Sequence, residues 1–290
     1  MKYGIYYAYW EKQWGGEYLP YVEKASGLGF DILEISCASL PDMGDRQIDE
    51  LRAAKEHCGI TLTGGYGPRA DENISSDDPA VVARGLDFWA KTFRVLERLG
   101  IGIVGGGLYS YWPVDYSKKV DKKADLARSV AGVKKMAAMA ADCGVTLCME
   151  VLNRFEGYLL NTAEEGVEFV KAVDCPNVRL MLDTFHMNIE EDSIGGAIRR
   201  AGKYLGHFHT GECNRRVPGQ GRVPWHEIGC ALRDIGYDGA VVMEPFVLMG
   251  GQVGQDIKVW RDLSGGASAV KLDRDAMDAL HFTKYVFERG

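Results

Sequence analysis

The chain contains 290 residues, of which 46% are apolar and 26% charged, as in ordinary soluble globular proteins. This composition excludes a disordered, collagen-like or coiled-coil chain, and no run approaches the roughly 18 apolar residues of a membrane span. The formal net charge of −7 at pH 7 disfavours contact with phosphate backbones, so we expect neither a nucleic acid nor a membrane partner.

Short apolar runs that follow a glycine or a glycine-like turn recur along the whole chain. They are rich in Val, Ile and Leu, which is typical of buried strands. Eight β-strands are predicted in this way, at residues 4–10, 30–36, 59–65, 100–106, 144–151, 178–185, 205–212 and 239–246.

Stretches with helical spacing separate these runs. Apolar residues three and four positions apart predict amphipathic helices. The start signals agree, because Ser76-Asp77-Asp78-Pro79 supplies cap candidates and a first-turn proline, and Asn161-Thr162 precedes a pair of glutamates. The helical stretches lie around residues 82–96, 126–137, 163–170, 228–235 and 273–288.

Strands that alternate with helices predict a parallel sheet, which forms either an open doubly wound fold or a closed barrel. The open fold usually carries a Gly-rich loop after its first strand, whereas residues 10–14 read WEKQW here. We therefore predict an α/β fold with a single (β/α)8 TIM barrel. No linker or low-complexity tract interrupts the chain, so residues 1–290 are expected to form one domain.

In such a barrel, functional residues lie at the carboxyl ends of the strands. Four candidate metal ligands occupy these ends: Glu150, Asp183, His209 and Glu244. Their intervals of 33, 26 and 35 residues are each close to one strand–helix unit. Four consecutive strands would therefore bring all four side chains to one mouth of the barrel.

Electrostatics favours a cation at that mouth. Two carboxylates about 4 Å apart repel by roughly 4 kcal/mol at an effective dielectric constant near 20. Three carboxylates and one imidazole suit Mn2+, Mg2+ or Co2+ better than a thiol-rich zinc site. The alternative is that each acid caps a helix or pairs with a nearby arginine.

Further polar residues follow the same strands. Glu156, His186 and Arg215 could bind the hydroxyls and carbonyl of a polar ligand. Surface ion pairs are the alternative, because Arg154 and Arg216 are equally well placed in the sequence. Arg215 is the only basic group expected near the mouth, so we expect unphosphorylated ligands.

Aromatic residues divide into two groups by their spacing. Trp89 and Phe93 have helical spacing and are expected in the core. A second group lies near strand ends, where rings could surround the apolar faces of a sugar: Tyr6, Trp14, Trp112 and Phe246. In the same region Gly107 ends a three-glycine turn that would let the backbone approach a ligand.

Several motifs together resemble the D-tagatose 3-epimerase family, above all its D-psicose (D-allulose) 3-epimerase members. The resemblance extends from the first strand to residue 267, which is nearly the whole chain. It rests on MKYGIYYAYW, GLYSYWPVDYS, MEVLNRFE, NTAEEGVEFV, MLDTFHMNIEEDS, GHFHTGECNRRVPG, VVMEPFV and IKVWRDLSGGA.

The resemblance implies a metal-dependent isomerase that interconverts D-fructose and D-psicose at C3. It implies Mn2+, with Co2+ or Mg2+ as alternatives, held by the four predicted ligands. Glu150 and Glu244 would also be the acid–base pair, acting through an enediolate. Glu156, His186 and Arg215 would hold the substrate near O1 and O2, with Tyr6, Trp112 and Gly107 completing the pocket. Where family members usually have Ala, this chain has Gly107, which puts the fine substrate preference in question.

The resemblance also implies a homodimer or homotetramer. Seven cysteines without a C-x-x-C motif favour reduced, mostly buried thiols and, with no predicted signal peptide, a cytoplasmic location. Three other functions compete. The nearest is another sugar isomerase or an inosose dehydratase of the same barrel superfamily. The other two are an endonuclease, which would need more histidines and a basic groove, and a sugar-binding protein without catalysis.

Overall fold

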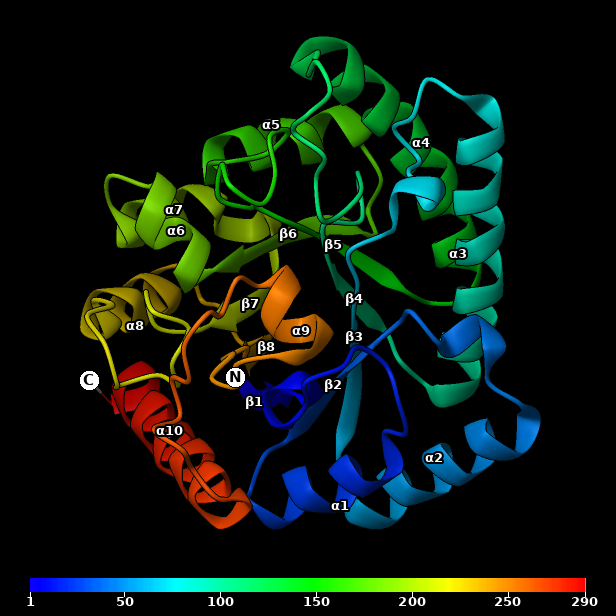
Figure 1. Cartoon of the computed structure of the whole chain (residues 1–290). Coiled ribbons are helices and arrows are strands. Elements are labelled where there is room, and N and C mark those ends of the chain that lie inside the picture. Colours follow the sequence, from blue (N-terminus) through cyan, green and yellow to red (C-terminus); the bar gives the residue numbers. More distant parts are fainter. Residues whose placement is uncertain (290) are drawn as a thin grey trace.

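Eight parallel strands close into a barrel, which confirms the predicted (β/α)8 architecture (Figure 1). The computed structural model describes residues 1–289. Strands pair in chain order, and β1 pairs with β8 to close the ring. The strands are β1 (Lys2–Tyr6), β2 (Ile32–Ser36), β3 (Thr61–Gly65), β4 (Ile103–Gly106), β5 (Thr146–Glu150), β6 (Val178–Asp183), β7 (Leu205–Thr210) and β8 (Ala240–Met243).

Helices surround the barrel, as Figure 1 shows. They include every helix that the apolar spacing predicts. The helices are α1 (Leu19–Gly27), α2 (Asp45–Cys58), α3 (Pro79–Leu99), α4 (Lys122–Asp142), α5 (Ala163–Val173), α6 (Thr184–Glu190), α7 (Ile194–Ala201), α8 (Trp225–Asp234), α9 (Gly251–Asp256) and α10 (Ala269–Arg289). Short 3-10 turns are η1 (Tyr7–Trp10), η2 (Leu40–Asp42), η3 (Ala70–Glu72) and η4 (Gly202–Tyr204).

The observed strands are shorter than the predicted ones, at the amino end in β2, β3 and β4 and at the carboxyl end in β1, β6, β7 and β8. The first run was predicted to remain extended to Trp10, but β1 ends at Tyr6 and the chain turns into η1. Likewise, β6 ends at Asp183, whose side chain accepts a hydrogen bond from the Phe185 backbone N–H and so begins α6. Apolar composition alone does not reveal these local hydrogen bonds.

Helix caps lie where the sequence predicts them. Asp78 is the N-cap of α3 and accepts a hydrogen bond from the Ala80 backbone N–H, with Pro79 in the first turn. Thr162 caps α5 in the same way through the Glu165 backbone N–H. These caps satisfy backbone donors that would otherwise lack partners within the helix.

The core fills the barrel and the layer between strands and helices. Trp89 and Phe93 are buried in that layer, as predicted. The prediction of mostly buried thiols is wrong: Cys37 and Cys148 are fully buried, but the other five cysteines are partly exposed. None of the helices in the described part of the chain combines the length and apolar character needed to cross a bilayer.

Candidate active site

The carboxyl ends of β5 to β8 bring the four predicted ligands together. Glu150 and Asp183 are the last residues of their strands, His209 lies near the end of β7, and Glu244 directly follows β8. Ligand atoms of Asp183, His209 and Glu244 lie within 4.8 Å of one another. A second set of Glu150, Asp183 and His186 meets the same limit, so Asp183 is common to both. The predicted convergence is confirmed, whereas the ligand roles stay predictions.

The electrostatics of this cluster suits a bound cation. Burial raises the pKa of Glu150 well above its usual range, and the nearby Glu244 carboxylate is the second largest cause of this shift. Burial disfavours the charged form of His209, yet Glu34 and Glu244 raise the pKa of His209 well above its usual value. The negative charge of Glu244 contributes to both shifts, after burial for Glu150 and after Glu34 for His209. A divalent ion would neutralise that charge.

Two buried atoms in the cluster are ready to accept a ligand. Within the described residues, Asp183 Oδ2 and His209 Nδ1 make no hydrogen bond. Buried polar atoms seldom lack a partner unless they bind a water or an ion or have a catalytic role. Carboxylate oxygens with one imidazole form a donor set for Mn2+ or Mg2+. The side chains present therefore fit a divalent cation.

Arg215 supplies a positive charge beside the cluster. Its guanidinium lies 3.3 Å from both Glu156 Oε1 and Glu244 Oε2, and 3.6 Å from Asp183 Oδ2. It also stacks on Phe185, with the guanidinium carbon 3.6 Å from the ring centroid. This contact selects Arg215 from the arginines that the sequence left open. Arg154, by contrast, pairs with Glu190 near the surface.

The proton on His186 can be placed by its neighbours. Its Nδ1 lies 2.8 Å from Asn153 Nδ2 and 3.3 Å from the Asn153 backbone nitrogen, which donates to it. Nδ1 is thus an acceptor, and the ring proton is on Nε2, 3.5 Å from Glu150 Oε1. Burial lowers the pKa of His186, which favours this neutral form. Asn153 was missed by the sequence analysis.

A cavity of about 320 Å³ opens over the cluster, and the other predicted residues line it. Trp14 packs edge-on against Trp112 and Phe246, with ring centroids 6.1 and 6.0 Å apart. Asp183 lies buried outside the lining itself. The predicted residues that line the cavity are Tyr6, Trp14, Gly107, Trp112, Glu150, Glu156, His186, His209, Arg215, Glu244 and Phe246.

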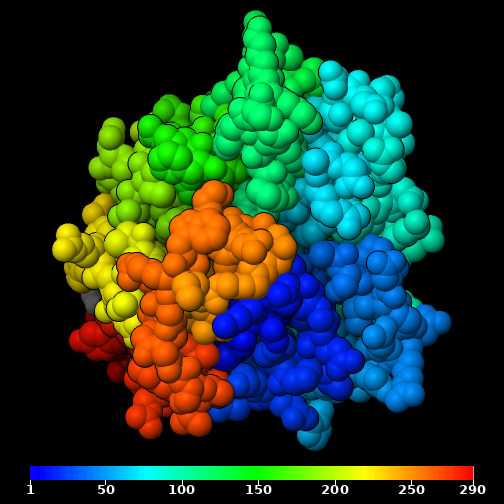
Figure 2. Space-filling view, viewed as in Figure 1, coloured from blue at the N-terminus to red at the C-terminus, as the bar shows by residue number. Residues whose placement is uncertain are grey.

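The loop that carries Lys12 and Trp14 contacts α9 beside this cavity, although the two segments are distant in the sequence. Trp14 Nε1 donates a hydrogen bond of 2.7 Å to Asp256 Oδ2, and the Val253 backbone N–H donates to the Lys12 carbonyl. Figure 2 shows the two segments in contact, blue and orange, in the view of Figure 1. The contact brings α9 against the loop that carries Trp14.

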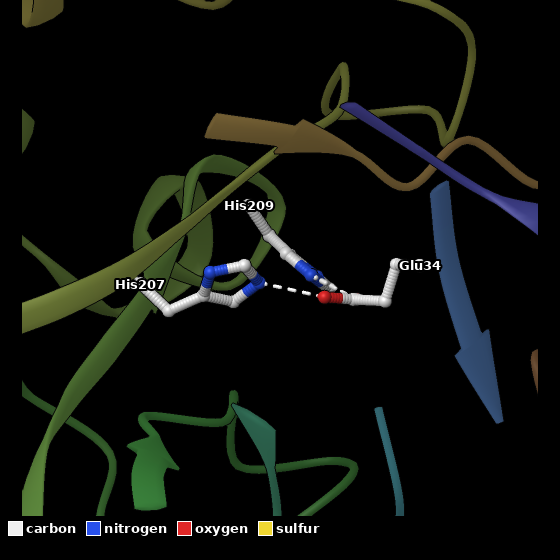
Figure 3. Close-up of side chains that lie close together, drawn as sticks. All are labelled: Glu34, His207 and His209. Atoms are coloured by element: carbon white, nitrogen blue, oxygen red, sulfur yellow. Dashed lines mark hydrogen bonds and ion pairs between the residues drawn. The ribbon is translucent and has the colours of Figure 1, made fainter. Parts of the chain in front are cut away.

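Some residues of the site lay outside the sequence prediction. Arg69 also lines the cavity, so the expectation that Arg215 is the only basic group near the mouth is wrong. Arg69 is paired with Glu72 and Asp71, however. Glu34 was also missed. It contacts His207 and His209 inside the barrel (Figure 3). The signal was an acid inside the apolar run ILEIS, but no local pattern identifies its partners.

Comparisons with known proteins identify the family of this chain. Residues 22–263 match the xylose isomerase-like TIM barrel family. The D-psicose 3-epimerase of Ruminiclostridium cellulolyticum is 61% identical over 99% of this chain and 98% of its own length. A crystal structure of D-psicose 3-epimerase with D-tagatose, from Clostridium cellulolyticum H10, superposes with a TM-score of 0.98 at 61% identity, covering 99% of this chain and 100% of its own.

A crystal structure of D-psicose 3-epimerase in the presence of D-fructose has the same TM-score of 0.98 at 57% identity, and the match covers 99% of both chains. Full-length similarity at this level relates whole enzymes and not only folds. This chain therefore belongs to the xylose isomerase-like TIM barrel family and, within it, to the D-psicose 3-epimerase group of isomerases.

Proposed function

We propose that this enzyme inverts free ketohexoses at C3, with interconversion of D-fructose and D-psicose as its reaction. The observation that carries this proposal is the meeting of two glutamates from different strands, Glu150 and Glu244, at one aromatic-walled cavity. Its volume of about 320 Å³ lies at the lower end of small-molecule sites, which suits a single sugar. The relatives named above are D-psicose 3-epimerases, and their crystal structures were determined with D-tagatose or in the presence of D-fructose. Both facts support the same substrate class.

We assign Glu150, Asp183, His209 and Glu244 as the residues that would hold a divalent ion, with Mn2+ as the native metal and Co2+ or Mg2+ as substitutes. When bound, the ion supplies Lewis-acid stabilisation of the negative charge that develops on a ketose as C3 loses its proton. The carboxylate-rich donor set supports these hard cations over a thiol-preferring metal.

The two glutamates would move the proton. One removes the C3 proton from one face of the sugar, and the other returns a proton to the opposite face, which inverts the centre. A base on each face is what distinguishes an epimerase from a 1,2-isomerase, which can act with one. Because Glu150 ends β5 and Glu244 follows β8, the two carboxyl groups approach the cavity from separate strands.

The remaining residues would orient the sugar. Arg215 and His186 each carry an N–H that could donate to the oxygens at C1 and C2, and Glu156 beside them could accept from a hydroxyl. Tyr6 and Trp112 would cover the apolar faces of the sugar, and Gly107 would leave space beside them.

Deuterium exchange tests this proposal directly. Wild-type enzyme in D2O should place deuterium at C3 of both D-fructose and D-psicose, as followed by NMR. Glu150→Gln and Glu244→Gln should each abolish turnover. The matched control is Glu168→Gln on the exposed face of α5, which should retain activity because, among residues 1–289, Glu168 forms an ion pair with Lys171 alone.

The products of the same assay separate the competing functions. A C3 epimer supports the proposal. An aldose product would identify a 1,2-isomerase instead, and a dehydrated ring would identify an inosose dehydratase. Epimerisation without any deuterium at C3 would contradict exchange between two bases.

We also propose that residues 1–290 act as one catalytic domain in a homodimer or homotetramer, as the resemblance implies. The seven free cysteines support a reducing, cytoplasmic setting. Sedimentation at several protein concentrations would measure the number of subunits.

A further inference from the structure

A carboxylate lies deeper in the barrel than the candidate metal site. Glu34, in the middle of β2, has no exposed surface. It accepts three hydrogen bonds: from His209 Nε2 at 2.6 Å, from His207 Nε2 at 2.8 Å and from Thr63 Oγ1 at 2.8 Å. Figure 3 shows both imidazole rings directed at this one carboxyl group. Such a group is costly to bury, so these partners are what make it tolerable.

The contacts join strands that are distant in the sequence. Thr63 is the register partner of Glu34 on the adjacent strand β3. His207 and His209 are two positions apart on β7, so both side chains face the same side, toward the interior of the barrel. In the ring of strands, β8 and β1 lie between β7 and β2. The cluster therefore bridges the interior of the barrel.

Two glycines provide the space for this bridge. A Cβ at Gly65 would lie 3.3 Å from Glu34 Oε1, and a Cβ at Gly105 would lie 3.2 Å from His207 Cδ2 and 2.3 Å from Met181 Sδ. Larger residues at these positions of β3 and β4 would crowd the carboxyl group and the ring. The glycines therefore belong to the same arrangement.

The hydrogen bond from His209 determines which of its nitrogens faces the cavity. An ionised carboxylate only accepts hydrogen bonds, so the proton on His209 lies at Nε2. In the neutral ring, Nδ1 then carries the lone pair. That atom has no hydrogen-bond partner among residues 1–289 and lies 3.8 Å from Glu244 Oε2, within the set formed with Asp183.

We propose that Glu34 is a positioning residue that orients His209 so that Nδ1 is the metal-binding nitrogen. The proposal rests on the proposed metal site. Metal-binding histidines commonly donate their other ring N–H to a carboxylate, which sets the tautomer and the ring angle. Thr63 and His207 hold Glu34 in turn through its Oε2.

A separate ion inside the Glu34 cluster is not supported. The cluster has suitable ligand types, but its nitrogen and oxygen atoms already lie 2.6 and 2.8 Å apart as hydrogen-bonded pairs. A tetrahedral ion binds each of its ligand atoms at about 2.0–2.2 Å. The nitrogen and oxygen of one pair would therefore have to lie farther apart if both bound the same ion. Positioning is therefore the role that these distances favour.

The test is the affinity for Mn2+ of Glu34→Gln, measured by electron paramagnetic resonance of the free ion. Loss of such a supporting carboxylate typically weakens metal binding about 10- to 100-fold. The matched control is Glu212→Gln. Glu212 is equally buried and also accepts three hydrogen bonds, from Gly219 N, Val223 N and Trp225 Nε1, but within the described part of the chain it hydrogen-bonds to no histidine.

We expect the Kd for Mn2+ to rise at least 10-fold in Glu34→Gln and to stay within about twofold of wild type in Glu212→Gln. A purely structural role would lower the melting temperature of both variants and leave both affinities alike. An unchanged Kd in Glu34→Gln, or an equal rise in both variants, would overturn the proposal.

Thr63→Val is the second variant, in case Glu34→Gln does not fold. It keeps the side-chain shape and removes one donor from Glu34, and Thr63 is not among the described residues that line the cavity. Weaker Mn2+ binding supports the proposal, and unchanged binding overturns it. Wild-type enzyme that binds no Mn2+, or Asp183→Asn that binds it as tightly as wild type, would instead refute the metal site itself and with it the role of Glu34.

Discussion

Removal of the divalent ion should destabilise the folded enzyme. Without it, the carboxylates of Asp183 and Glu244 lie within 4.8 Å of each other, where two like charges repel by roughly 3.5 kcal/mol or more at an effective dielectric constant near 20. Arg215 offsets part of this repulsion from 3.6 and 3.3 Å. Binding of an ion by the folded state alone would therefore remove a large carboxylate–carboxylate repulsion.

The size of the effect follows from binding linkage. At a free Mn2+ concentration of 100 times its Kd, the folded state gains about 2.7 kcal/mol. A chain of 290 residues has an unfolding entropy of about 0.6 kcal/mol/K, so the melting temperature should rise by about 4 °C. Differential scanning calorimetry of chelator-stripped protein, with and without added Mn2+, measures this shift.

Asp183→Asn is a sharp control for the same experiment. Asparagine retains an oxygen that can accept from the Phe185 backbone N–H and cap α6, but it loses the anionic ligand. The melting temperature of this variant should not respond to Mn2+. A stripped wild-type enzyme that keeps its activity, and whose melting temperature does not change on addition of Mn2+, would refute the reasoning.

Three further outcomes are expected. Gly107→Ala should fold normally, because its Cβ would lie 3.4 Å from Leu152 Cδ1, an ordinary contact distance, and a lower melting temperature would contradict this. The added methyl group narrows the cavity, so the kcat/KM ratio between D-psicose and D-tagatose should change. D-Fructose should be turned over with a far higher kcat/KM than fructose 6-phosphate, since Arg69 is already paired with Glu72, and the opposite preference would count against the assignment. Arg215→Lys keeps the charge but loses the planar fork, so kcat/KM should fall at least about 10-fold, and an unchanged value would remove Arg215 from substrate binding.

The sequence alone was sufficient to predict the barrel and the convergence of four polar residues at its mouth. Each βα unit repeats an apolar run and an amphipathic stretch, and consecutive parallel strands end at the same edge. Glu150, Asp183, His209 and Glu244 could therefore be placed together from their spacing of about one unit. Local caps at Asp78 and Thr162 were equally visible, because a capping side chain and the backbone N–H that donates to it lie within a few residues.

Contacts between distant strands were decided only by the tertiary structure. Arg154, Arg215 and Arg216 are equivalent as sequence, and only the folded loop directs Arg215 onto Phe185 and toward three carboxylates. Glu34 shows the same limit, because 173 residues separate it from His207. Their hydrogen bond exists only after β1 pairs with β8, since closure of the ring is what brings the interior faces of β2 and β7 within reach of each other.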